Sequence, residues 1–282
     1  MNFLRWKISK LESYNKKKLG NIVFLPIAVI CGILGFGSPI FFATVSETAL
    51  EDVASLLVMN GKLRLVDVFG KHRDIDAEIQ EIDRYCKDRF IELVPNLNSF
   101  GHFERWLRHP TYKHMAECPD GFVRENPYIK RDHGSTLKPN QKSLDFISSL
   151  YEEYLPNLSS KKFNVGLDEP WELGQGWSKE KVEEVGKGQV YLGHLEGIRK
   201  LVEKHGKHMQ FWSDVLLEDP ENAKLLDKHA SPIIWGYEPT HPFEEQAAVI
   251  AACGLKFCLA PGSATWKSFT GRWSIAQKNI EL

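Results

Sequence analysis

Short apolar segments alternate with amphipathic helical segments in this chain from about residue 62 onward. Strands separated by helices favour parallel β-α-β units over a β-sandwich. The expected strands are 62–69, 91–96, 161–169, 209–217, 231–238 and 255–262. The expected helices are 74–90, 143–155 and about 180–205, and a long polar loop is expected to run from the second strand to about residue 140.

This alternation predicts an α/β fold of the (β/α)8 TIM-barrel type. A doubly wound open sheet is the main alternative, but the sequence contains no glycine-rich phosphate loop. Four expected strands end in polar or aromatic clusters, namely PNLNSFGH, GLDEPW, FWSD and WGYEP. Barrel enzymes carry their chemistry at the carboxyl ends of the strands, so these clusters mark the expected site. Because six strands can be identified, we expect a partial barrel that is incomplete at its C-terminal end.

The N-terminal region differs from the rest of the chain. Residues 21–43 contain no charged side chain, and three consecutive lysines (16–18) precede them. About 20 apolar residues can span a bilayer as a helix, and a basic flank predicts that the preceding end stays in the cytoplasm. We therefore expect a basic segment at 1–20, a transmembrane helix or signal anchor at 21–43, a linker with a first strand at 44–73, and a barrel domain at 74–282.

This organisation predicts a membrane-anchored or secreted protein whose barrel domain lies outside the cytoplasm. The sequon Asn157-Leu158-Ser159 fits that location, although such triplets are common by chance. The alternative is a cytoplasmic protein in which 21–43 form a buried strand and loop.

Charge and cysteine content exclude several classes of function. The formal net charge is -1, so no basic field is present to hold a nucleic acid. The 5 cysteines are dispersed and form no C-x-x-C motif, which argues against a zinc site or a disulfide framework. The 8 tryptophans are numerous, and several lie beside polar residues, as in the wall of a sugar site or in an ordinary core.

Two adjacent carboxylates, Asp168 and Glu169, end the apolar segment FNVGL. A metal site is disfavoured because no H-x-H or H-E-x-x-H motif accompanies them. Ordinary glycosidases place two carboxyl groups on opposite sides of the scissile bond, a gap that neighbouring residues seldom span. Adjacent acids suit a substrate-assisted glycosidase, in which the 2-acetamido group of the sugar attacks its own anomeric carbon. A solvated helix N-terminus is the non-functional alternative.

VGLDEPW resembles the x-G-x-D-E signature of family 20 glycoside hydrolases, the β-N-acetylhexosaminidases. ELVPNLNSFGH is similar to the strand end of that family that closes in P-G-H, and FWSD and WGYEP resemble its later strand ends. Together with the runs NSFGHFERWLRHPTYKHMAECPDGF and GLDEPWELGQG, these segments resemble a bacterial branch of the family over about residues 75 to 273.

The resemblance implies a role for each matching residue. Glu169 would be the general acid and base, Asp168 would hold the acetamido N–H, and His102 would belong to the polar network beside the acid. The substrate-binding residues would be His102, Asn96, Trp171, Trp212, Asp214, Trp235, Glu238 and Trp266. The implied ligand is an N-acetylhexosamine glycoside (GlcNAc or GalNAc), with no metal and no cofactor.

The sequence departs from the family pattern in three respects. Phe100-Gly101-His102 replaces P-G-H, six strands stand in place of eight, and no arginine near the N-terminus matches the one that grips sugar hydroxyls. Two alternatives therefore remain open. One is a catalytically inactive, membrane-tethered carbohydrate-binding or vestigial protein, and the other is a barrel glycosidase for sugars that lack an acetamido group.

Overall fold

The computed structural model describes residues 57–59, 62–66, 72–73, 75–262 and 272–281. The expected segments 1–20 and 21–43, and most of 44–73, lie outside these residues and stay predictions. Within the described part of the chain, no helix is long and apolar enough to cross a membrane.

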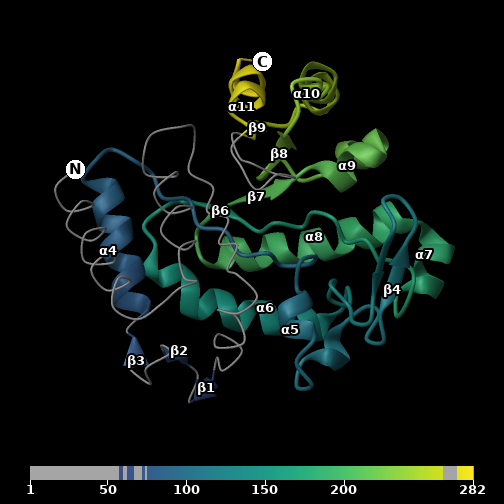
Figure 1. Cartoon of the computed structure of the whole chain (residues 1–282), viewed down its shortest axis with the longest axis horizontal. Coiled ribbons are helices and arrows are strands. Elements are labelled where there is room, and N and C mark those ends of the chain that lie inside the picture. The colour runs from purple at the N-terminus through teal and green to yellow at the C-terminus, as the bar shows by residue number, and fades with distance from the viewer. Residues whose placement is uncertain (1–56, 60–61, 67–71, 74, 263–271, 282) are drawn as a thin grey trace.

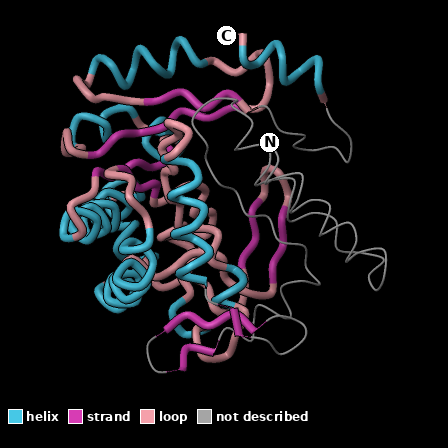
Figure 2. The backbone as a smooth tube through the Cα atoms, turned by 90° about the vertical axis from the view of Figure 1, so that its left-hand side faces the viewer, coloured by secondary structure: helices cyan, strands magenta, loops and turns pink. Residues whose placement is uncertain are grey.

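A parallel four-stranded sheet forms the centre of the described structure (Figures 1 and 2). Its strands follow the order of the sequence: β6 (Lys162–Asn164), β7 (His208–Trp212), β8 (Ala230–Gly236) and β9 (Cys258–Pro261). Phe163 pairs with Met209, Phe211 with Pro232, and Ile234 with Leu259. Because all four strands run in the same direction, the segments that follow them emerge at one edge of the sheet.

Helices precede and connect these strands. α4 (Ile75–Lys87) and α6 (Gln141–Tyr154) come before β6, and α7 (Lys179–Val185) and α8 (Lys187–Lys204) connect β6 to β7. α9 (Asp214–Glu218) and the 3-10 turn Pro220–Leu225 lead to β8, α10 (Phe243–Ala252) leads to β9, and α11 (Trp273–Ile280) follows. Figure 1 shows α6 and α8 together on one side of β6. This arrangement is the repeating β-α unit of a barrel wall.

The core lies between the sheet and the helices that cover it. Tyr151 of α6, Tyr191 and Ile198 of α8, and Phe163 and Phe211 of the strands are all fully buried. In α8 the buried residues recur every three or four positions, as one apolar face of a helix requires. β8 is buried along almost its whole length, which is typical of a parallel strand covered on both faces.

Several sequence predictions are confirmed in kind but not in extent. The last four expected strands exist, but each is shorter, and 209–217 was wrong after Trp212 because α9 begins at Asp214. The expected helix 180–205 is two helices, because Gly186 adopts a φ of 87° between α7 and α8.

The first two expected strands do not join the parallel sheet as full strands. Segment 91–96 forms a single parallel bridge, between Asn96 and Asn164, and Pro95 has no N–H to donate. The expected strand 62–69 is β2 (Lys62–Val66), which pairs antiparallel with β1 (Leu57–Met59) and β3 (His72–Arg73). The expectation of about six strands in one barrel wall is therefore wrong for the described residues.

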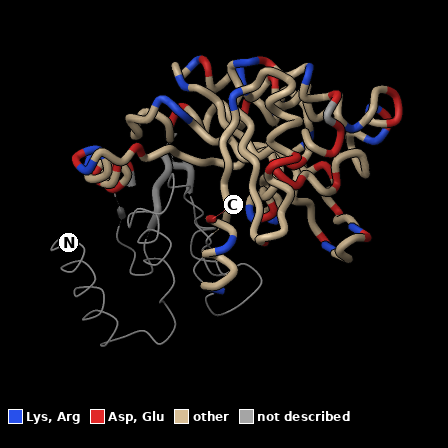
Figure 3. The backbone as a smooth tube through the Cα atoms, turned by 90° about the horizontal axis from the view of Figure 1, so that it is seen from above, with Lys and Arg blue, Asp and Glu red and all other residues tan. Residues whose placement is uncertain are grey.

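The long polar loop contains structure that its sequence did not reveal. It includes α5 (Glu104–Leu107), a 3-10 turn (Lys113–Met115), and a hairpin of β4 (Phe122–Arg124) and β5 (Ile129–Arg131). After α6, a further 3-10 turn (Leu155–Asn157) leads towards β6. Figure 3 shows basic and acidic segments interspersed along the described backbone.

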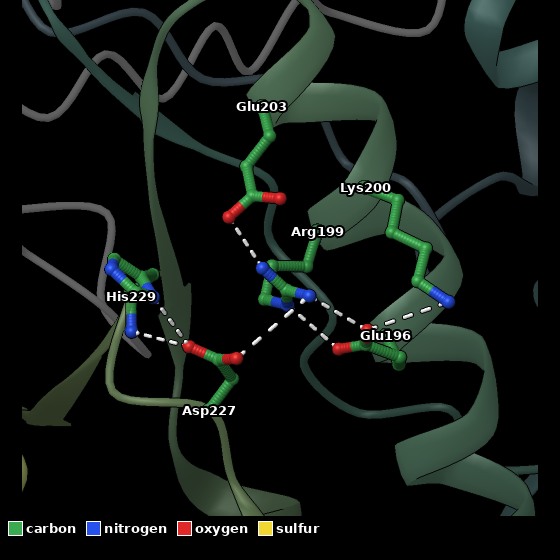
Figure 4. Close-up of polar contacts among 6 residues, drawn as sticks. All are labelled: Glu196, Arg199, Lys200, Glu203, Asp227 and His229. Atoms are coloured by element: carbon green, nitrogen blue, oxygen red, sulfur yellow. Dashed lines mark hydrogen bonds and ion pairs between the residues drawn. The ribbon is translucent and has the colours of Figure 1, made fainter.

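A polar cluster around Arg199 fastens α8 to the turn before β8 (Figure 4). The Arg199 guanidinium donates to Glu196 at 2.6 Å and to Glu203, and its Nη2 lies 3.8 Å from Asp227 Oδ2. His229 Nδ1 lies 2.8 Å from Asp227 Oδ1. The Arg199 side chain is only 10% exposed, whereas its acidic partners are partly solvated.

We expect Arg199→Met to lower the free energy of unfolding by about 1–3 kcal/mol, because several charge-assisted hydrogen bonds are lost from a buried guanidinium. Urea unfolding measures this change. Lys200→Met is the matched control, since Lys200 is 65% exposed and contacts Glu196 at 3.6 Å. Equal losses in the two variants would contradict a structural role for the Arg199 cluster.

Candidate active site

Asp168 and Glu169 lie on a tight turn that follows β6. Gly166, Leu167 and Glu169 have positive φ values of 72°, 71° and 47°, and such angles in residues other than glycine store backbone strain. At Gly166 a Cβ would meet Asn98 Oδ1 at 2.2 Å, so only glycine fits there. The turn brings both acids to the edge of the sheet where the strands end.

A second loop, residues 99–102, packs directly against this turn. A Cβ on Gly101 would lie 2.4 Å from the backbone oxygen of Asp168, and His102 also has a positive φ of 57°. The buried side chains of His194 and Tyr151 hold Ser99, with His194 Nε2 2.9 Å from the Ser99 carbonyl oxygen and Tyr151 Oη 2.5 Å from Ser99 Oγ. The close backbone contact at Gly101 therefore sets where His102 meets the acids.

A buried carboxylate fixes the chain just after the two acids. Glu172 is fully buried and accepts hydrogen bonds from the backbone N–H and hydroxyl groups of both Ser135 and Thr136. The Ser135 carbonyl in turn accepts a hydrogen bond from the Phe103 backbone N–H, at 2.8 Å. Glu172 thus joins the acid-bearing turn to the loop that carries His102.

His102 bridges the two acids. Its Nε2 lies 3.2 Å from Asp168 Oδ2 and 3.5 Å from Glu169 Oε2. The three facing atoms lie within 4.8 Å of one another, which is the only group of potential metal ligands that we find among the described residues. A hydrogen bond from a protonated ring to Asp168 accounts for this geometry, and the expectation of no metal and no cofactor stays a prediction.

The surroundings of His102 favour its charged form. Burial of the ring opposes a charge, but the hydrogen bond to Asp168 and the negative charges of Asp168, Glu104 and Glu169 outweigh it. Together they raise the pKa of His102 from 6.5 to about 9. At neutral pH the imidazolium therefore stands between the two acids.

Burial acts in the opposite sense on the neighbouring carboxyl groups. It raises the pKa of Glu169, as does the charge of Asp168, while His102 and Arg124 partly offset the shift. Asp214, at the start of α9, accepts the Glu169 backbone N–H at 3.0 Å, and burial together with the charge of Asp168 raises the pKa of Asp214 to about 7. A glutamic acid that keeps its proton at higher pH than usual is suited to general acid catalysis.

The predicted aromatic residues occupy different surroundings. Trp171 packs its ring edge-on against His102, with ring centroids 6.1 Å apart, and Arg124 lies over that ring. At the end of β8 the rings of Trp235 and Tyr237 lie edge to face, with their centroids 5.7 Å apart. Trp212 is only 2% exposed. Trp212 thus offers almost no surface to a ligand, and Trp266 lies outside the described residues.

Two predicted polar residues are engaged elsewhere. Asn96 donates its side-chain N–H to the Asn164 carbonyl at 3.3 Å, which supports strand pairing. Glu238 forms a bidentate ion pair with Arg272, with both contacts at 2.8 Å. The structure therefore brings Asp168, Glu169, His102, Asp214 and Trp171 together, and assigns Asn96 and Glu238 to other contacts.

The sequence reasoning missed two residues of the site. Tyr237 follows β8, and burial together with the charges of Asp168 and Glu169 raises its pKa. Tyr237 stands inside WGYEP, so its motif was a usable signal. Arg124 influences Glu169 from the β4–β5 hairpin, and no motif marked it.

We expect Gly101→Ala to destabilise the protein by about 1–3 kcal/mol, because the added methyl group would clash with the Asp168 carbonyl. Thermal unfolding measures the effect. Gly193→Ala in α8 is the matched control: a Cβ there meets nothing within 4 Å, and alanine favours a helix. A melting temperature unchanged by Gly101→Ala would contradict the close contact.

We expect an NMR titration of the His102 ring to give a pKa of about 9, and Asp168→Asn to lower it towards or below 6.5, since burial then dominates. Because the folded-state pKa is raised, the stabilising contribution is fully present below pH 6.5 and is lost as the pH rises to about 9. Asp120→Asn, at an exposed acid, is the control. A pKa that stays near 9 in Asp168→Asn would refute the pairing.

Comparison with known proteins identifies the family. The model of "Glycosyl hydrolase family 20, catalytic domain" matches residues 72–278. Hexosaminidase D of Bos taurus is 25% identical over 218 residues, covering 71% of this chain and 56% of the relative. Hexosaminidase D of Homo sapiens is 24% identical over 209 residues, covering 71% of this chain and 40% of the relative. The chain thus spans about half the length of these relatives.

A solved structure shows the same fold. The β-N-acetylhexosaminidase from Bacteroides fragilis is 16% identical, with a TM-score of 0.53, covering 69% of this chain and 39% of that chain. This similarity confirms the TIM-barrel type of fold, of which the described sheet is a part. The family resemblance read from VGLDEPW and the other strand ends is likewise confirmed. The chain belongs to glycosyl hydrolase family 20.

Proposed function

We propose that this protein is a retaining β-N-acetylhexosaminidase that releases terminal β-linked GlcNAc or GalNAc by substrate-assisted catalysis. The observation that carries the proposal is the placement of Asp168 and Glu169 side by side, with His102 bridging them and the pKa of Glu169 raised. Membership of family 20 and two relatives named hexosaminidase D support the substrate class.

The separation of the two acids argues for substrate assistance. The facing oxygens of Asp168 and Glu169 lie within 4.8 Å of each other. Inverting glycosidases need about 6.5–9.5 Å between their carboxyl groups, and double-displacement enzymes place theirs across the bond at about 5–5.5 Å. Adjacent residues that share one histidine are placed to approach the substrate from the same side, which supports a nucleophile supplied by the substrate itself.

The first chemical step assigns one role to each acid. Glu169 donates its proton to the glycosidic oxygen as the bond from that oxygen to C1 breaks. The acetamido carbonyl oxygen forms a new bond to C1, which gives a cyclic intermediate. Asp168 accepts the amide N–H and stabilises the positive charge that develops there. Its Oδ1 has no hydrogen-bond partner among the described residues, so one acceptor of this carboxylate is unused within the chain.

The second step reverses the proton transfer. Glu169, now a carboxylate, removes a proton from water, and the water oxygen attacks C1 and opens the ring of the intermediate. Two inversions at C1 give net retention. The Glu169 backbone N–H donates to Asp214 at 3.0 Å, which fixes the position of the acid, and the contact of His102 with Asp168 aligns the second carboxylate.

We expect the full chain to release nitrophenol from the nitrophenyl glycosides of N-acetyl-β-glucosamine and N-acetyl-β-galactosamine. Glu169→Gln should lower kcat by about 10²–10⁴ and Asp168→Asn by about 10²–10³, because proton transfer or charge stabilisation is lost. Turnover requires protonated Glu169, whose raised pKa extends activity to higher pH than an ordinary glutamate would allow. The alkaline limb of a kcat–pH profile measures this extension.

Three controls make the assay specific. Asp120→Asn removes an exposed acid and should leave turnover unchanged. The matching β-glucoside, which has no acetamido group, should not be cleaved, and a thiazoline mimic of the cyclic intermediate should inhibit strongly. A folded chain that cleaves none of these substrates would overturn the enzyme proposal in favour of a carbohydrate-binding or vestigial protein.

A further inference from the structure

Arg124 comes from a distant part of the sequence and lies over the Trp171 ring, which packs against His102. It is the last residue of β4, in the hairpin that belongs to the segment between α5 and α6 (Figure 1). Its guanidinium carbon lies over the Trp171 ring, 4.7 Å from the ring centroid, and its charge lowers the pKa of Glu169. Stacking on an aromatic face holds an arginine in place while its N–H groups stay free.

The terminal nitrogens of Arg124 are available to a ligand. Its Nε donates to the Asn126 carbonyl at 3.1 Å, which fixes the side chain within its own hairpin. Among the described residues, no carboxylate forms an ion pair with Arg124. The two Nη groups therefore form an unused fork beside the site, and such a fork matches the two oxygens of a carboxylate, sulfate or phosphate.

Protonation of Glu169, which the proposed reaction requires, removes a negative charge near Arg124. Asp168 and Glu104 exert their charges on His102, which holds its own positive charge at neutral pH. Arg124 lowers the pKa of Glu169. Once Glu169 is protonated, Arg124 faces no negative charge from it, and an anion on the substrate can take that place.

Arg124 lies over the ring of Trp171, which follows Glu169 by two residues and packs against His102, and this position indicates which part of the substrate it meets. In the proposed reaction Glu169 protonates the glycosidic oxygen, whereas Asp168 holds the acetamido group of the sugar that is released. A group beside Glu169 therefore meets atoms beyond the glycosidic oxygen. We propose that Arg124 binds an anionic group on the leaving-group side of the substrate, so that the enzyme prefers N-acetylhexosamine linked to an acidic partner; this inference rests on the proposed function.

A binding measurement tests the preference without turnover. Glu169→Gln in the full chain mimics the protonated acid and slows hydrolysis strongly, because the side chain has no proton to donate. Calorimetry compares its affinity for two disaccharides, GlcNAc β-linked to glucuronic acid and GlcNAc β-linked to glucose. With the same linkage, the two differ only at C6 of the second sugar, which is a carboxylate in the first and a hydroxymethyl group in the second. We expect the acidic disaccharide to bind about tenfold more tightly, as for one bidentate charge-assisted contact.

Three further variants, each combined with Glu169→Gln, assign that preference. Arg124→Gln should abolish it, and Arg124→Lys should retain part of it, because the charge remains but the fork is lost. Arg131→Gln, in the other strand of the same hairpin, removes an equal charge from an exposed position and should retain the full preference.

A pH profile of the active protein gives an independent reading. Glu169 is influenced by burial, His102, Asp168 and Arg124, and its backbone contacts Asp214. Because Arg124 lowers the pKa of Glu169, Arg124→Gln should move the alkaline limb of kcat to higher pH. Arg131→Gln should leave that limb unchanged.

The outcomes separate this inference from the proposed function. Equal affinity for the two disaccharides, including no measurable binding of either, overturns the inference, as does a preference that survives Arg124→Gln. Hydrolysis of N-acetyl-β-glucosaminides together with equal affinities would leave the enzyme proposal standing alone. An Arg124-dependent preference in a chain that hydrolyses nothing would support the anion contact and overturn the enzyme proposal.

Discussion

The geometry of the site depends on the hydrogen bonds that the buried carboxylate of Glu172 accepts. This carboxylate accepts four hydrogen bonds from Ser135 and Thr136. Residues 135–137 also form backbone hydrogen bonds with Phe103 and Phe100. The turn that carries Asp168 and Glu169 is therefore tied to the loop that carries His102. A fully buried carboxylate is costly unless its oxygens are satisfied, so these partners are required together.

Within this frame, neighbouring charges divide the work of the site. His102 is held positive by Asp168, and burial keeps Glu169 protonated to higher pH than an ordinary glutamate. The two acids are adjacent in sequence but differ in their surroundings, which is how one site can hold a carboxylate and a proton donor side by side. Arg124 adds a cation from a third segment, with its guanidinium over the Trp171 ring.

Much of the fold and part of the site could be predicted from the sequence. Periodicity located the last four parallel strands and helices α4 and α6, because burial on one face or on both leaves a regular apolar pattern. It failed at Trp212, where a strand gives way to α9, and at Gly186, which splits one helix into two. The β4–β5 hairpin was missed because its short strands are half-exposed and have no continuous apolar run.

The sequence by itself determined the family, the adjacent acids and the strand ends that carry them, because those features are local and survive as motifs. Only the tertiary structure decided which residues meet. It joined His102 to Asp168, placed Arg124 over Trp171, and paired Glu238 with Arg272. These contacts join segments 34 or more residues apart in the chain, and no local pattern records a contact that depends on how strands and loops pack in space.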